Sequence, residues 1–156
     1  MKLKIETAAI SDLQEVQNLN LLLFKKEYAE FDTTLNCDWT FSENGTQYFA
    51  SRINEGSVFV ARIDTKIVGY LACGIREYHV PYRKQTVTAE LESMFVLDNY
   101  RGKGIGTALY DAFLTWCKAH GVGRIRVVAS AQNVTSTDFY RKKGLSDYDL
   151  ALEADI

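Results

Sequence analysis

Three glycines at alternate positions, Gly102, Gly104 and Gly106, stand between an apolar run and an amphipathic segment. Glycine lets successive backbone N–H groups turn toward one point, and a helix N-terminus adds a partial positive charge there. Such a turn suits an anion, and a phosphate or pyrophosphate is its natural ligand. A tight turn without a ligand is the alternative reading, because one glycine motif alone is not specific.

The residues around this turn disfavour two familiar phosphate-binding patterns. A P-loop places a lysine and then Ser or Thr after its last glycine, whereas Gly106 is followed by Thr107 and Ala108. A dinucleotide-binding turn has G-x-G-x-x-G spacing and an acidic residue at the end of the next strand. The spacing here differs, and the next strand, near residues 124–129, carries no acid. Nucleotide hydrolysis and hydride transfer therefore both lose support.

Strands and helices that alternate along the chain must position this turn. Hydrophobic periodicity predicts strands at residues 2–7, 57–63, 66–76, 86–97, 125–129 and 148–152, and helices at 11–30, 47–53, 105–120 and 134–143. Ser11 and Gln14 are spaced as a capping box for the first helix, and Asp64-Thr65 forms the turn of a hairpin. The order βααβββαβαβ predicts one α/β (α+β) domain over residues 1–156, with helices on both faces of a mixed, mostly antiparallel sheet.

Composition limits which binding partners and which cell compartment we expect. The 156 residues include 18 basic and 20 acidic side chains, a net charge of −2 that speaks against nucleic acid as a partner. Cys37, Cys73 and Cys117 lack the close pairs of metal or redox motifs, so we expect buried free thiols, no metal site and a cytoplasmic protein. The start of the sequence has no apolar leader-like segment, and no apolar run is long enough to span a bilayer, so no membrane is expected.

Two separated motifs resemble the GNAT superfamily of acetyl-CoA-dependent N-acetyltransferases. The first is 91–96, Leu-Glu-Ser-Met-Phe-Val, followed at 101–106 by Arg-Gly-Lys-Gly-Ile-Gly, which matches R-x-x-G-x-G. The second runs over 133–144 as N-x-x-S-x-x-F-Y-x-K-x-G. The resemblance also covers the order of elements, although residues 11–54 carry no family-specific residues. It implies a GNAT-like sheet with splayed central strands that hold coenzyme A.

The resemblance implies a coenzyme A site with three parts. The pantetheine arm would pair like an extra strand with an opened strand edge, and the pyrophosphate would rest on the glycine turn. The amide of Asn133 would reach the pantetheine arm, although a bare helix N-cap explains the same residue. The expected cofactor-binding residues are Met94, Phe95, Val96, Arg101, Gly102, Lys103, Gly104, Ile105, Gly106, Thr107, Asn133 and Tyr140. Arg101 and Lys103 could equally be solvated surface cations.

Three side chains are candidates for acid–base catalysis. The resemblance implies that Tyr140 donates a proton as the CoA thiolate leaves. The alternative is that Tyr140 is an aromatic residue of the core, although Phe139 beside it already supplies an apolar anchor. The amine must lose a proton before it attacks. Glu90 and Glu92 alternate onto one face of their strand and are the candidate bases, because the next strand carries no glutamate. A pair of solvent-facing acids is the alternative.

The acceptor is less clear from the sequence. Residues 27–51 contain five acids and no lysine or arginine, with six interleaved aromatics. In relatives this region forms a wall of the acceptor site, which would favour a small cationic amine, whereas aromatics also pack cores and charge runs also face water. We expect direct transfer of acetyl to a primary amine. A protein N-terminus or lysine as acceptor, and a non-catalytic acyl-CoA-binding module, are the alternatives, and a homodimer is compatible with these features.

Overall fold

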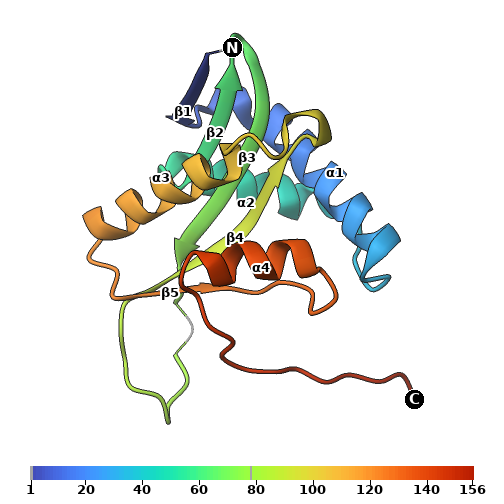
Figure 1. Cartoon of the computed structure of the whole chain (residues 1–156), viewed down its shortest axis with the longest axis vertical. Helices are drawn as coiled ribbons and strands as arrows, with labels where there is room; N and C mark the ends of the chain where they lie inside the picture. The colour runs from blue at the N-terminus through green and yellow to red at the C-terminus, as the bar shows by residue number, and fades with distance from the viewer. Residues whose placement is uncertain (1, 78) are drawn as a thin grey trace.

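The computed structural model describes residues 2–77 and 79–156 and contains a twisted five-stranded sheet in the order β1-β2-β3-β4-β5 (Figure 1). The first four strands, β1 (Leu3–Thr7), β2 (Val58–Ile63), β3 (Lys66–Ile75) and β4 (Thr88–Val96), pair antiparallel, and β5 (Arg124–Val127) pairs parallel with β4. The helices are α1 (Leu13–Glu30), α2 (Glu43–Asn54), α3 (Ile105–Ala119) and α4 (Val134–Lys142). The expected fold class is confirmed.

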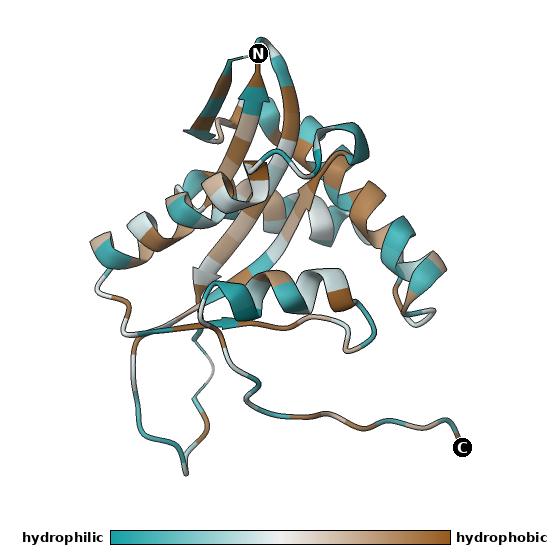
Figure 2. Cartoon of the chain, in the orientation of Figure 1, coloured by the Kyte–Doolittle hydropathy of each residue, from teal (hydrophilic) through white to brown (hydrophobic). Residues whose placement is uncertain are grey.

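Each face of the sheet is covered by one pair of helices. On one face, buried Val16 of α1 and Phe49 of α2 pack on Val60 and Tyr70. On the other, Leu109 of α3 and residues of α4 pack on the opposite side chains of the same strands. The central strands are largely tan to brown, whereas the helices alternate between teal and brown (Figure 2). β3 is buried from Ile67 to Gly74 because both of its faces are covered.

Local predictions were wrong at three places. Residues 148–152 form no strand and are exposed, because the alternating segment finds no partner strand among the described residues. The second helix begins at Glu43 rather than near 47, because the Ser42 hydroxyl accepts a hydrogen bond from the Gly45 N–H at 3.1 Å and caps it. Ser11 caps nothing; a 3₁₀ turn precedes α1, and the Asp12 carboxylate accepts from the Ala9 N–H at 2.9 Å.

Two irregularities in β4 shape the region where the sheet opens. Ser93 pairs with Ala72 and Leu91 pairs with Cys73, so Glu92 is an extra residue in a bulge. On its other side, β4 pairs with β5 only over residues 88–91. Among the described residues, no strand pairs with this edge of β4 from Glu92 to Val96. The sheet therefore splits beside the bulge.

Candidate active site

The glycine turn leads directly from β4 into α3. Gly102 and Gly104 have φ angles of 72° and 80°, in the left-handed region that favours glycine, and Gly104 is the N-cap of α3. A Cβ built at either position meets no heavy atom within 4 Å, so open space surrounds the turn. The backbone geometry and the helix N-terminus fit an anionic group such as a pyrophosphate.

The two basic side chains of the turn, Arg101 and Lys103, contact neighbouring aromatic rings. The Arg101 Nε donates to the carbonyl oxygen of Val96 at 2.9 Å, its guanidinium lies 5.0 Å from the Phe95 ring, and it pairs with Asp98 at 3.1 Å. The Lys103 Nζ lies 5.6 Å from the Tyr100 ring. Arg101 therefore ties the turn to the end of β4.

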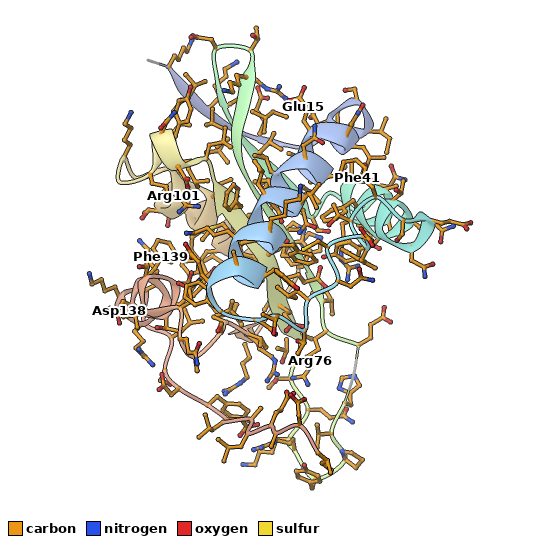
Figure 3. All side chains as sticks on the ribbon, turned by 90° about the vertical axis from the view of Figure 1, so that its right-hand side faces the viewer. Glu15, Phe41, Arg76, Arg101, Asp138 and Phe139 are labelled. Carbon is orange, nitrogen blue, oxygen red and sulfur yellow. The ribbon has the colours of Figure 1, made fainter. Side chains whose placement is uncertain are left out.

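The start of α3 and the end of α4 pack beside the turn. Ile105 is buried in the core, and a Cβ on Gly106 would lie 3.7 Å from the Phe139 ring. Figure 3 labels Arg101, in the turn before α3, and Phe139, on α4. Thr107 follows in the first turn of α3, where its N–H group is one of those without an intrahelical partner.

The Tyr140 side chain belongs to the core on the α3 face of the sheet, together with Leu109 and Tyr110. It is 9% exposed and contacts Phe139 edge to face, and its hydroxyl has no hydrogen-bond partner among the described residues. Burial raises the pKa of Tyr140 above its usual value, with further contributions from Glu27, Tyr110 and Tyr70. Glu27 and Tyr70 belong to the face of α1 and α2, whereas Tyr140 packs with α3. Charges on the α1 and α2 side of the sheet therefore contribute to the raised pKa of this phenol.

Asn133 caps α4. Its side-chain oxygen accepts a hydrogen bond from the Ser136 N–H at 3.2 Å. The cap expected from the sequence is present, and it leaves the two amide N–H donors of this side chain for another partner.

The two glutamates of β4 lie on the face toward α1 and α2 but differ in their partners. Both oxygens of Glu92 are occupied: Oε1 accepts from Tyr48 and from the Arg52 Nε, each at 2.7 Å, and Oε2 accepts from the second Arg52 nitrogen at 2.9 Å. Glu90 has a longer contact, 3.6 Å, with the Nε of Arg126, and that nitrogen has no hydrogen-bond partner among the described residues. Glu90 is the less constrained carboxylate.

A buried chain of hydrogen bonds reaches the β4 bulge from α1. Tyr70 donates to the Ser93 Oγ at 2.8 Å and accepts from Asn20 at 2.9 Å, and Asn20 accepts from the Thr40 hydroxyl at 2.7 Å. Sequence reasoning missed this network. The only local signal was a polar Ser93 in a largely apolar strand segment, and its partner is 23 residues away.

Sequence reasoning also missed Glu27 as a catalytic candidate. It treated this residue only as one of the five acids of residues 27–51. Glu27 is partly buried near the end of α1, and its side chain has no hydrogen bond or ion pair among the described residues. Burial, and then the charge of Asp32, raises the pKa of this carboxyl. Its field reaches both Tyr140 and Tyr70. The charge of Glu27 therefore favours the protonated form of the candidate acid, Tyr140.

The interleaved aromatics divide between core and surface. Trp39, Tyr48 and Phe49 pack against one another with ring centroids 4.8–5.8 Å apart, whereas Tyr28 and Phe41 are exposed. Much of this wall is therefore core. A pocket of about 320 Å³ lies beside it, lined by Arg52, Ile75, Arg76, Glu77, Glu90 and Glu92.

Two kinds of feature are absent from the described residues. No group of three or more His, Cys, Asp or Glu side chains is arranged to hold a metal ion. None of the helices in residues 2–77 and 79–156 has the length and apolar character to cross a membrane. All three cysteines are free thiols, with Cys73 and Cys117 buried.

The unpaired edge of β4 thus leads into a left-handed glycine turn at the start of α3, and the buried phenol of Tyr140 lies on the same face as α3. A sequence model of the acetyltransferase (GNAT) family matches residues 13–145. The chain belongs to this family, and the expected class of enzyme, N-acetyltransferase, is confirmed.

Two archaeal proteins show the relationship in sequence. An uncharacterized N-acetyltransferase of Methanocaldococcus jannaschii is 28% identical over 94 residues, which are 60% of this chain and 41% of that protein. An N-alpha-acetyltransferase of Sulfurisphaera tokodaii is 26% identical over 149 residues, 92% of this chain and 80% of that protein. The chain thus spans less than half of the first relative and most of the second.

Solved structures show the shared fold. A tetramutant of the BH1408 protein from Bacillus halodurans has a TM-score of 0.83 at 21% identity, with 100% of each chain covered. The PaiA N-acetyltransferase from Thermoplasma acidophilum, in complex with coenzyme A, has a TM-score of 0.80 at 20% identity, covering 97% and 94%. AAC(6')-Iy, in complex with a CoA-acetylneamine bisubstrate analog, has a TM-score of 0.77 at 16% identity, covering 100% and 99%.

Proposed function

We propose that the chain transfers an acetyl group from acetyl-CoA to a primary amine by direct attack of the amine. The observation that carries the proposal is the unpaired edge of β4 at residues 92–96, which leads into the left-handed turn at the start of α3. The edge offers N–H and C=O groups to an amide-bearing arm, and the turn offers N–H groups to a pyrophosphate. Coenzyme A contains both groups.

On this proposal, the backbone of Met94, Phe95 and Val96 pairs with the pantetheine arm, and the N–H groups from Gly102 to Thr107 hold the pyrophosphate. Arg101 positions the turn through its bond to the Val96 carbonyl rather than by a free charge. Asn133 caps α4 with its oxygen and offers its free N–H donors to the arm. Bound acetyl-CoA supplies the activated acetyl thioester.

Tyr140 is the proposed general acid. Because burial raises its pKa, the hydroxyl keeps its proton at neutral pH, which is the form that can donate. Its O–H has no partner among the described residues, so it is free to hydrogen-bond the departing sulfur. The proton passes to the thiolate as the amide bond forms, and the phenolate is reprotonated from the base or from solvent.

The proposed base is a carboxylate on the face of the sheet toward α1 and α2. Glu92 accepts three hydrogen bonds, so its geometry favours holding Arg52 and Tyr48 in place. Glu90 and Glu27 keep acceptor capacity, and desolvation raises the pKa of Glu27, which makes it a better proton acceptor. We propose that Glu90 or Glu27 takes the ammonium proton, directly or through water.

A small cationic amine is the proposed acceptor. Glu27 lacks a cationic partner among the described residues and lies near Asp32, which suits an ammonium group. The fold shared with an aminoglycoside N-acetyltransferase agrees with this choice. The relationship to an N-alpha-acetyltransferase supports a second candidate, a protein or peptide N-terminus. A non-catalytic acyl-CoA-binding module is the third.

One assay separates the three candidates. Free CoA thiol is measured with acetyl-CoA and a panel of polyamines, an aminoglycoside, amino acid derivatives and peptides with free N-termini. We expect turnover with the small cations, and Tyr140→Phe should abolish most of it while Tyr28→Phe, an exposed tyrosine on α1, should not. Turnover only with peptides would favour the second candidate, and CoA binding without turnover on any amine would refute the enzyme proposal.

A further inference from the structure

The hydrogen bonds between α1 and β4 form a chain in which every donor points the same way. The Thr40 hydroxyl donates to the side-chain oxygen of Asn20, and the amide nitrogen of Asn20 donates to the Tyr70 hydroxyl. Tyr70 in turn donates to the Ser93 Oγ at 2.8 Å. Ser93 is the last member of the chain, and its own hydroxyl hydrogen has no acceptor among the described residues.

The start of this chain is buried and held from both helices. Thr40 and Tyr70 are 0% exposed, and Asn20 is 1% exposed. Gln17 of α1 donates to the Thr40 carbonyl oxygen at 3.0 Å and to the Thr46 hydroxyl of α2 at 2.9 Å. Burial raises the pKa of Tyr70 to about 12, so its phenol keeps its proton at neutral pH and remains a donor. In a dry interior, such a chain holds each hydroxyl in one orientation.

The end of the chain, in contrast, is accessible. Ser93 is partly exposed, and its Oγ already accepts a hydrogen bond from Tyr70, so its O–H is directed away from that phenol. The neighbouring Glu92 differs, because both of its oxygens accept bonds from Tyr48 and Arg52 and it offers no donor. The structure therefore leaves one hydroxyl donor at the accessible end of a buried chain.

Ser93 lies at the start of the unpaired edge of β4. It follows the bulge residue Glu92, and β5 pairs with β4 only as far as Leu91. The glycine turn lies beyond the other end of this edge, after Val96. An arm that runs from a pyrophosphate at the turn along the edge covers about 10 Å between Val96 and Ser93, at about 3.3 Å per residue. In acetyl-CoA, the end of that arm carries the thioester.

We propose, as an extension of the transferase function above, that the Ser93 hydroxyl donates a hydrogen bond to the thioester carbonyl oxygen of acetyl-CoA. Negative charge grows on that oxygen as the amine attacks, and a donor that is already oriented stabilises the charge. Ser93 keeps its proton throughout, and proton transfer to the sulfur stays with Tyr140. Tyr70 and Asn20 are positioning residues, because they act on the substrate only through Ser93.

Isotope-edited infrared spectroscopy tests this hydrogen bond without turnover. Acetyl-CoA with a heavy carbon isotope at the acetyl carbonyl is bound in the absence of amine. Because a hydrogen bond lowers the carbonyl stretching frequency, we expect a lower frequency on the wild type and on Ser93→Thr than on Ser93→Ala. The matched control is Tyr48→Phe, which removes a 2.7 Å hydroxyl bond to Glu92 and should keep the wild-type frequency. Identical frequencies for the wild type and Ser93→Ala would overturn the proposal.

Steady-state kinetics test the positioning role. We expect Ser93→Ala to lower kcat about 100-fold, with CoA affinity, measured by titration, unchanged. Tyr70→Phe keeps the ring but loses the bond to Ser93, so kcat should fall about 10-fold in the single variant. In Tyr70→Phe/Ser93→Ala, kcat should equal that of Ser93→Ala, because Tyr70 has no route to the substrate once the hydroxyl is gone.

The same double-mutant comparison provides the control for general damage. A loss from Tyr48→Phe should multiply with that of Ser93→Ala, because Tyr48 acts on a different residue. Losses that also multiply for Tyr70→Phe would contradict positioning through Ser93.

Together, the two measurements distinguish the role of Ser93 from the transferase activity itself. A wild type that shows the lowered frequency but releases no thiol with any amine would refute the transferase function and support the Ser93 bond. A wild type that acetylates an amine with the same kcat as Ser93→Ala would refute the role of Ser93 and support the transferase function.

Discussion

Replacing Gly102 by alanine tests whether the turn before α3 binds coenzyme A through its backbone. Gly102 and Gly121 have nearly the same φ, 72° and 66°, and a Cβ at either would meet no heavy atom within 4 Å. The only direct cost of alanine is therefore the left-handed conformation, about 1–2 kcal/mol at each site. Gly121, at the far end of α3, is a matched control.

The same strain should have different consequences at the two sites. Residues 101–104 are exposed, so a Gly102→Ala chain can relax to negative φ in the free protein. Coenzyme A must then restore the turn, and its affinity should fall by about 5- to 30-fold, which corresponds to about 1–2 kcal/mol. At Gly121, the helix end is held by the Val122 N–H bonded to the Cys117 carbonyl at 3.0 Å. There the strain should appear as lost stability.

Calorimetric titration with coenzyme A and urea unfolding measure the two quantities separately. We expect Gly102→Ala to weaken binding with little change in the free energy of unfolding. We expect Gly121→Ala to lower the free energy of unfolding by about 1–2 kcal/mol with unchanged affinity. Equal affinities for the wild type and Gly102→Ala would refute backbone binding at this turn, and an equal loss of affinity in both variants would show a nonspecific effect.

The remaining predictions concern side chains of the candidate active site. Tyr140→Phe should lower kcat about 100-fold or more with little change in CoA affinity, as steady-state kinetics and titration will show; an unchanged kcat would remove Tyr140 as the acid. Arg52→Gln leaves Glu92 without its bidentate partner and should lower the free energy of unfolding, measured in urea, by about 1–2 kcal/mol. The control Lys26→Gln breaks an exposed pair and should lower it by less than about 0.5 kcal/mol. Equal losses in the two variants would contradict this expectation. Burial raises the pKa of Glu27, so its stabilising contribution is complete below about 4.5 and is lost as pH rises through the folded-state pKa. Glu27→Gln should therefore gain melting temperature relative to wild type between pH 4 and pH 7, and a constant difference would argue against the raised pKa.

Local sequence signals predicted the backbone features of the proposed donor region. The glycine turn, the amphipathic face of α3 and the Asn133 cap each depend on residues within a few positions of one another. Their physical causes, left-handed φ at Gly102 and Gly104 and a side-chain bond to a nearby N–H, act over the same short range. Such features can be recognised before the rest of the chain is placed.

The acceptor half depends on contacts that the sequence does not display. The bulge at Glu92 becomes visible only in the register of β4 against β3, and Glu92 meets Arg52 across 40 residues. Glu27 gains its importance because burial raises its pKa and its charge raises the pKa of Tyr140, which lies more than 100 residues away in the chain. Strand alternation placed Glu90 and Glu92 on one face but could not show that Glu92 is already saturated with hydrogen bonds.

The missing sixth strand has a different physical cause. The alternation at 148–152 is a valid strand signal, but a strand also requires an edge with free hydrogen-bonding groups within reach. One such edge exists at β5, and the Tyr148 ring lies 4.9 Å from the guanidinium carbon of Arg124 in that strand, while Leu150 and Leu152 remain exposed. The periodicity therefore reports a propensity that the contacts of the described residues leave unsatisfied. A net charge of −2 likewise conceals an acidic C-terminal segment, residues 147–156, and the basic Arg124 and Arg126 of β5.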